Sequence, residues 1–142
     1  MTQFDAAKYK STTRDQWETA ASAWNAWGPQ LRTWLGPATE VMLDMVHAGD
    51  GSKILDVAAG AGDQTMQAAA RVGSRGSVLA TDISPKILSY CEANARAAGL
   101  ANVSIRTADG EDLPVESGSF DAVISRVGLI YFPDQQITSR FV

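Results

Sequence analysis

The stretch KILDVAAGAGDQT, residues 53–65, decides the fold. It begins as a short apolar run with β-branched residues, which is typical of a buried strand, and continues into a loop of alanine and glycine. A loop with almost no side chains lets a ligand approach the backbone closely and meet main-chain N–H groups. The stretch therefore predicts a strand that runs into a ligand-binding turn.

Downstream of this loop, helices and strands alternate. The alanine-rich residues 64–72 predict a helix, and residues 77–82 predict a second strand. Ser84-Pro85 supplies an N-cap residue and a proline at the first helical position, so the next helix is predicted over residues 85–98. Its buried stripe should comprise Ile87, Leu88, Cys91 and Ala95.

Two further strands are predicted over residues 103–109 and 120–126. Because right-handed crossovers join such strands, the pattern predicts an α/β fold with a doubly wound parallel sheet and helices on both faces. A short helix is expected to start near Asp134. The acidic loop between the last two strands is expected to be solvated; its charged residues are Glu111, Asp112 and Glu116.

The first 50 residues are expected to form a helical cap on a core that comprises residues 51–142. One helix is predicted over residues 15–26 and is stopped by Gly28-Pro29. A second is predicted over residues 37–47, with one apolar face made of Val41, Met42, Met45 and Val46.

All four tryptophans, Trp17, Trp24, Trp27 and Trp34, fall in this cap. Two interpretations stay open: an aromatic lid over a ligand, or ordinary packing of the helices. His47 is expected at a helix C-terminus, where an imidazolium interacts favourably with the helix dipole.

Composition narrows the classes of function. The chain has 142 residues and a net charge of -4 at pH 7, and no basic stripe that would bind nucleic acid. Cys91 is the single cysteine, so we expect no internal disulfide and no metal site. No apolar stretch approaches the roughly 18 residues that span a bilayer. We therefore expect a protein of the reducing cytoplasm without a membrane span.

Three carboxylates lie in or at the ends of the predicted strands. Asp82 ends the second strand, where it is well placed to accept hydrogen bonds from two ribose hydroxyls, or to cap the turn at Ser84-Pro85. Asp56 would be costly to bury without partners, and Asp109 ends the third strand. A nicotinamide fingerprint, G-x-G-x-x-G, would need its third glycine at Thr65, which disfavours a dehydrogenase.

Three segments in sequence resemble the successive cofactor motifs of class I S-adenosylmethionine-dependent methyltransferases: ILDVAAGAGDQT, VLATDISPKIL and TADGEDLPVESGSFDAVISRVGLIYFPD. The likeness is closest to small-molecule methyltransferases of the ubiquinone/menaquinone-biosynthesis type, and it covers residues 53–142. It implies a Rossmann-like sheet of strand order 3-2-1-4. It also implies S-adenosylmethionine as cofactor and S-adenosylhomocysteine as product.

The resemblance implies which residues hold the methionine part of the cofactor. This part would lie against the loop of residues 58–62, and Asp56 would orient its amino group. Arg126 follows the fourth strand near the same end, where its backbone, more than its side chain, is the expected contact.

The resemblance also implies the nucleoside contacts. Asp82 would accept the ribose hydroxyls, and Ile83 would pack on the adenine. Asp109, with the backbone of Gly110, would read the adenine edge. The implied site residues are together Asp56, Ala58, Ala59, Gly60, Gly62, Asp82, Ile83, Asp109, Gly110 and Arg126.

The chain departs from the family pattern at two places. Ala58 stands where a first glycine is usual, and four strands are predicted where the family has seven. The expected function is methyl transfer to a small molecule, which needs positioning and exclusion of water more than a dedicated acid or base, so no catalytic residue is nominated. The alternative is an inert, truncated relative that binds the cofactor or self-associates, and we expect little turnover from this chain alone.

An open sheet edge predicts self-association. Residues 120–126 would lack the neighbouring strand that the family places beside them, and an apolar edge pairs readily with another chain. We expect a homo-oligomer that covers this edge or the apolar tail of Ile130, Tyr131, Phe132 and Phe141.

Overall fold

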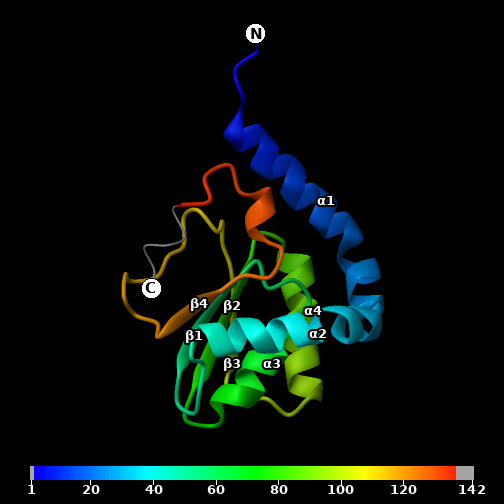
Figure 1. The fold of residues 1–142 in the computed structure, drawn as a ribbon. Helices are drawn as coiled ribbons and strands as arrows, with labels where there is room; N and C mark the ends of the chain where they lie inside the picture. The colour runs from blue at the N-terminus through cyan, green and yellow to red at the C-terminus, as the bar shows by residue number, and fades with distance from the viewer. Residues whose placement is uncertain (1, 137–142) are drawn as a thin grey trace.

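A four-stranded parallel sheet forms the centre of the molecule in the computed structural model, which describes residues 2–136 (Figure 1). The strand order is β3-β2-β1-β4, so the predicted α/β sheet and its order are confirmed. The strands are β1 (Lys53–Val57), β2 (Ser77–Asp82), β3 (Val103–Thr107) and β4 (Ala122–Ile124).

The register brings the carboxyl ends of the first three strands together. Val57 of β1 pairs with Thr81 of β2, and Asp82 pairs with Thr107 of β3. The loops that follow these strands therefore leave the sheet at one edge, which is where parallel α/β sheets bind ligands.

The helices α3 (Asp63–Val72) and α4 (Pro85–Ala97) lie close to their predicted bounds. The Ser84 side chain accepts a hydrogen bond from the N–H of Ile87 at 3.2 Å and so caps α4. The predicted stripe is confirmed, since its four members are buried: Ile87, Leu88, Cys91 and Ala95.

The two faces of the sheet are covered differently. On one face Ile54 and Val78 pack with helical residues such as Leu43 and Val72. On the other face Leu55 and Val57 pack in a cluster that contains no residue of α1–α4. The expectation of helices on both faces therefore does not hold for the described residues. A loop follows β3 instead of a helix, and it covers this face with Leu113, Val115 and Phe120.

The first two helices are longer than the sequence predicts. Helix α1 (Ala6–Ala26) starts nine residues before its predicted start at residue 15. The side chain of Asp5 accepts a hydrogen bond from the N–H of Lys8 and so caps this N-terminus. Helix α2 (Gly28–Met45) begins at the glycine-proline pair that was predicted to stop α1. Proline stabilises a helix start because its missing N–H needs no partner there.

The predicted apolar face of α2 is partly wrong. Val41 is 57% exposed and Met45 is 75% exposed. The helix instead buries Leu31, Thr39 and Leu43, a stripe set by its packing on the core beside α3. His47 follows the end of α2 and is exposed.

The chain after β3 is less regular than predicted. The strand predicted over residues 120–126 is ordered as a strand only from Ala122 to Ile124, and the backbone turns at Val127, whose φ is 65°. A 3-10 helix, η1 (Leu129–Tyr131), precedes the position of the predicted short helix. Residues 134–136 are not helical, and the rest of that helix lies outside the described residues, as does Phe141.

Candidate cofactor-binding site

The loop after β1 is shaped by backbone that only small residues adopt easily. Ala58, Gly60 and Gly62 have φ values of 58°, 62° and 97°, in the left-handed region. A Cβ atom on Gly62 would lie 2.7 Å from the Sγ atom of Cys91. Because α4 packs so closely here, this position requires glycine.

A cavity of about 150 Å³ opens above this loop. Seven of the ten predicted site residues line it, while Asp56, Ala59 and Gly62 do not. Its walls also come from α1, from the segment after β4 and from η1. The lining residues are Lys10, Thr13, Trp17, Trp24, Ala58, Gly60, Thr81, Asp82, Ile83, Ile87, Ala108, Asp109, Gly110, Glu111, Arg126, Val127, Gly128, Tyr131, Phe132 and Pro133.

Asp82 joins the loop to the strand beside it. One carboxylate oxygen accepts the N–H of Gly60 at 3.0 Å, and the other accepts the N–H of Ser84 at 3.0 Å. The turn-capping role is therefore present, and Asp82 also lines the cavity. Burial raises the pKa of Asp82, although these backbone hydrogen bonds favour its ionised form.

Asp109 belongs to an ion-pair cluster that the sequence analysis missed. The Nζ atom of Lys10 lies 2.7 Å from Oδ2 of Asp109 and 2.7 Å from Oε2 of Glu111. Although burial opposes it, the hydrogen bonds that Lys10 donates to these two carboxylates raise the pKa of Lys10. The expectation of a solvated Glu111 is wrong, because this residue is buried and also accepts the N–H of Asp134 at 2.9 Å.

Asp56 lies inside β1 and is buried. Gln64 donates to Oδ1 at 3.2 Å and Thr65 donates to Oδ2 at 2.6 Å, so its partners are side chains of α3. Burial raises the pKa of Asp56 to about 7 in spite of these hydrogen bonds. Its role toward the cofactor's amino group stays a prediction.

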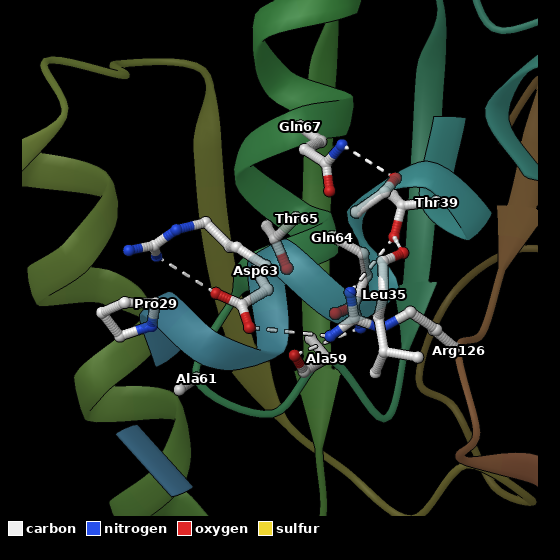
Figure 2. A network of polar contacts seen from close by, with 12 residues as sticks. Pro29, Leu35, Thr39, Ala59, Ala61, Asp63, Gln64, Thr65, Gln67 and Arg126 are labelled. Carbon is white, nitrogen blue, oxygen red and sulfur yellow. Dashed lines mark hydrogen bonds and ion pairs between the residues drawn. The ribbon is translucent and has the colours of Figure 1, made fainter. Parts of the chain in front are cut away.

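Arg126 lines the cavity, and its expected backbone contact with the cofactor stays a prediction. Its guanidinium donates from Nη1 to Oγ1 of Thr39 at 3.1 Å (Figure 2). Its Nη2 atom lies 3.7 Å from Oδ2 of Asp63, the first residue of α3. Arg32 of α2 contacts the other oxygen of Asp63 at 3.3 Å.

The tryptophans divide between the two interpretations. Trp17 and Trp24 line the cavity and meet edge to face, with ring centroids 5.3 Å apart. Trp17 also meets the ring of Tyr131 at 5.6 Å. Trp27 and Trp34 are 61% and 75% exposed. Only the first pair therefore has the position of a lid.

The remaining titratable candidates do not add a reactive centre. Burial raises the pKa of Cys91 to about 12, so the thiol is inert and packs as a small apolar side chain. Within residues 2–136, no group of three or more histidine, cysteine or acidic side chains is placed to hold a metal ion. No helix of that range is long and apolar enough to cross a membrane.

The donor and acceptor groups of the cavity fit S-adenosylmethionine. Asp82 and Asp109 offer carboxylate acceptors at the ends of neighbouring strands, and Ile83 offers an apolar surface beside them. Arg126 supplies a cation near the loop. Hydroxyls, a flat base and a carboxylate are the matching groups of the cofactor.

Known proteins with similar sequences include methyltransferases. A methyltransferase domain family matches residues 54–141. Nocamycin O-methyltransferase from Saccharothrix syringae is 38% identical over 98 residues, which are 69% of this chain and 35% of that enzyme. Aklanonic acid methyltransferase DauC from Streptomyces sp. is 28% identical over 128 residues, or 90% of this chain and 57% of that enzyme. The chain spans about half the length of the curated relatives it matches.

Solved structures share the fold. A putative S-adenosyl-L-methionine-dependent methyltransferase from Methanococcus maripaludis superposes with a TM-score of 0.75 at 20% identity, over 87% of this chain and 56% of that one. These comparisons do not favour an inert binding protein over an enzyme. The chain belongs to the class I S-adenosylmethionine-dependent methyltransferases.

Proposed function

We propose that the cavity binds S-adenosylmethionine and that the protein transfers its methyl group to a small molecule. The observation that carries the proposal is the placement of Asp82 at the end of β2 and of Asp109 just after β3, with Ile83 next to Asp82 and all three lining one cavity. This placement supports ribose contacts at Asp82 and adenine contacts at Ile83, Asp109 and Gly110. The names of the nocamycin and aklanonic acid enzymes support a small-molecule acceptor.

Methyl transfer needs positioning of the reactants and exclusion of water more than a dedicated acidic or basic side chain. When bound, the cofactor supplies an electrophilic methyl group on a sulfonium centre. The chain's residues hold the reactants in line and exclude water, and Trp17, Trp24 and Tyr131 are placed to do this at the cavity wall. The unpaired Cys91 supports a location in the reducing cytoplasm.

Calorimetric titration of the folded protein with S-adenosylhomocysteine should give saturable heat with one site per chain. NAD serves as the control ligand and should give none, since the loop lacks the third glycine of the nicotinamide fingerprint. The proposal fails if folded protein shows neither heat nor a thermal shift with millimolar S-adenosylmethionine or S-adenosylhomocysteine.

We also propose a homo-oligomer formed through the β4 edge. Among the described strands, β4 pairs only with β1, which leaves its other side open to a second copy. Light scattering over a concentration series should show a dimer or larger species. The alternative surface is the apolar tail, in which Ile130 is 64% exposed. The substitution Ile130→Glu should disrupt an oligomer formed through this tail and leave an oligomer formed through the β4 edge intact. A monomer at every concentration would contradict the proposal.

A further inference from the structure

We infer that α2 carries a self-association surface of its own, on which two copies of this chain pack helix against helix. This surface is separate from the β4 edge, and it does not depend on the cofactor. It is a row of apolar residues that starts just before α2 and runs along one side of it, and we call it the α2 stripe. Its members are Trp27, Leu31, Trp34, Ala38, Val41 and Met45.

The α2 stripe has the spacing of a helix that packs against another helix. Its successive members are alternately four and three residues apart, which places them along one seam. All of them except Leu31 are exposed. Helix α2 already packs on α3 through other residues, among them Met42 and Leu43. The α2 stripe is therefore apolar surface that the packing within residues 2–136 does not cover.

The same surface offers a groove and a side chain that can fill it. The groove lies between α1 and α2, and none of its lining residues within residues 2–136 is charged. Trp34 lines the groove and is 75% exposed. A two-fold interface joins the same patch on both chains, so Trp34 of each copy can enter the groove of the other. The lining residues are Ala20, Ala23, Trp24, Trp27, Gln30, Leu31 and Trp34.

The charges of α2 favour a copy of this chain over a charged partner. Arg32 pairs with Asp63 at 3.3 Å. Arg71 of α3 pairs with both Glu40 and Asp44. The three charged residues of α2 are thus used within the chain, and none of them belongs to the α2 stripe. A second α2 stripe can approach without meeting a row of like charges.

The area of the α2 stripe fits an interface between two chains. From the exposed fractions of its large side chains, it exposes on the order of 500 Å² of apolar surface. Exposed apolar patches of this size commonly mark interaction sites. A stable interface buries roughly 800 Å² on each partner, with an apolar centre and a polar rim. The α2 stripe can therefore form the centre of an interface of that size.

Light scattering over a concentration series, on wild type and on matched variants, tests the inference. Trp34→Glu places a charge in the α2 stripe and should weaken self-association about 10- to 100-fold, because tryptophans at the centre of an interface carry much of its binding energy. Val41→Glu, farther along the α2 stripe, should act in the same direction. Phe4→Glu is the control, since Phe4 is a 65% exposed aromatic residue outside the α2 stripe. This control should stay within about 2-fold of wild type.

Each outcome decides the inference. Wild type that stays monomeric at every concentration overturns it and leaves the α2 stripe to a different protein or to an apolar small molecule. If Trp34→Glu associates like wild type, the copies meet elsewhere, as at the β4 edge, and the inference is wrong. An equal loss in Phe4→Glu would assign the effect to net charge and would also overturn it. If circular dichroism shows that Trp34→Glu is unfolded, Val41→Glu decides by the same criteria.

Discussion

Replacing Asp82 with alanine is expected to weaken the binding of S-adenosylhomocysteine by about two to four orders of magnitude. Asp82 lines the cavity at the end of β2, and we propose that its carboxylate accepts hydrogen bonds from both ribose hydroxyls. Each hydrogen bond to a charged group contributes roughly 1.5–3 kcal/mol, and two of them account for this range. The loss also frees the N–H of Gly60 and loosens the loop, which adds to the effect.

Calorimetry on Asp82→Ala measures the loss, and Asp121→Ala is the matched control. Asp121 also accepts a backbone N–H, that of Lys53 at 2.8 Å, but it lies at the amino end of β1, away from the cavity. Asp121→Ala should lower the stability of the fold slightly and should bind S-adenosylhomocysteine with the affinity of wild type. A folded Asp82→Ala protein that binds as tightly as wild type would move the ribose to another part of the cavity.

Local signals explain which elements were predictable. The strand at residues 77–82 is bounded by turn and cap residues next to it in sequence, and its predicted bounds agree with β2. Helix α1 ends at Ala26, as predicted from Gly28-Pro29, but the same pair also begins α2, because proline is well tolerated at the first helical position. The early part of α2 was missed because it buries only a few residues, such as Leu31, and so has no continuous apolar stripe in the sequence.

The site likewise contains residues that the local sequence indicates and residues whose contacts are distant in the sequence. Residues at strand ends were predictable because parallel strands bring their carboxyl ends to one edge, as Asp82 and Asp109 show. The contact between Lys10 and Asp109 joins residues 99 positions apart, and no local pattern indicates it. The side-chain contacts of Arg126 were missed for a similar reason, since its partners Thr39 and Asp63 lie on α2 and α3, far from Arg126 in the sequence.

Asp56→Asn is expected to stabilise the protein above neutral pH by a few kcal/mol. The pKa of Asp56 is about 7 in the folded protein, against 3.8 as its ordinary value, chiefly because the carboxyl is buried. Between these pH values the unfolded chain releases a proton that the folded chain keeps, so stability falls as the pH rises. Asparagine fills the same space and does not ionise. Its amide group can still form hydrogen bonds with Gln64 and Thr65.

Chemical unfolding of both proteins from pH 4 to pH 8 measures the difference. Near pH 4 the two free energies of unfolding should be close, and the gap should open as the pH approaches 7 and then level off. Asp121→Asn, which removes an exposed carboxylate, controls for the change in net charge. A difference in stability that is the same at every pH would show that folding does not raise the pKa of Asp56.

The same variant separates stability from function. A buried carboxylate that lowers stability at neutral pH has no structural reason to be there, whereas one that helps to hold a cationic amino group does. Asp56→Asn should therefore be more stable at pH 8 and bind S-adenosylhomocysteine more weakly, while its affinity for 5′-methylthioadenosine, which lacks the amino group, is unchanged. Equal affinities of wild type and variant for S-adenosylhomocysteine would assign Asp56 to the packing of α3 against the loop alone.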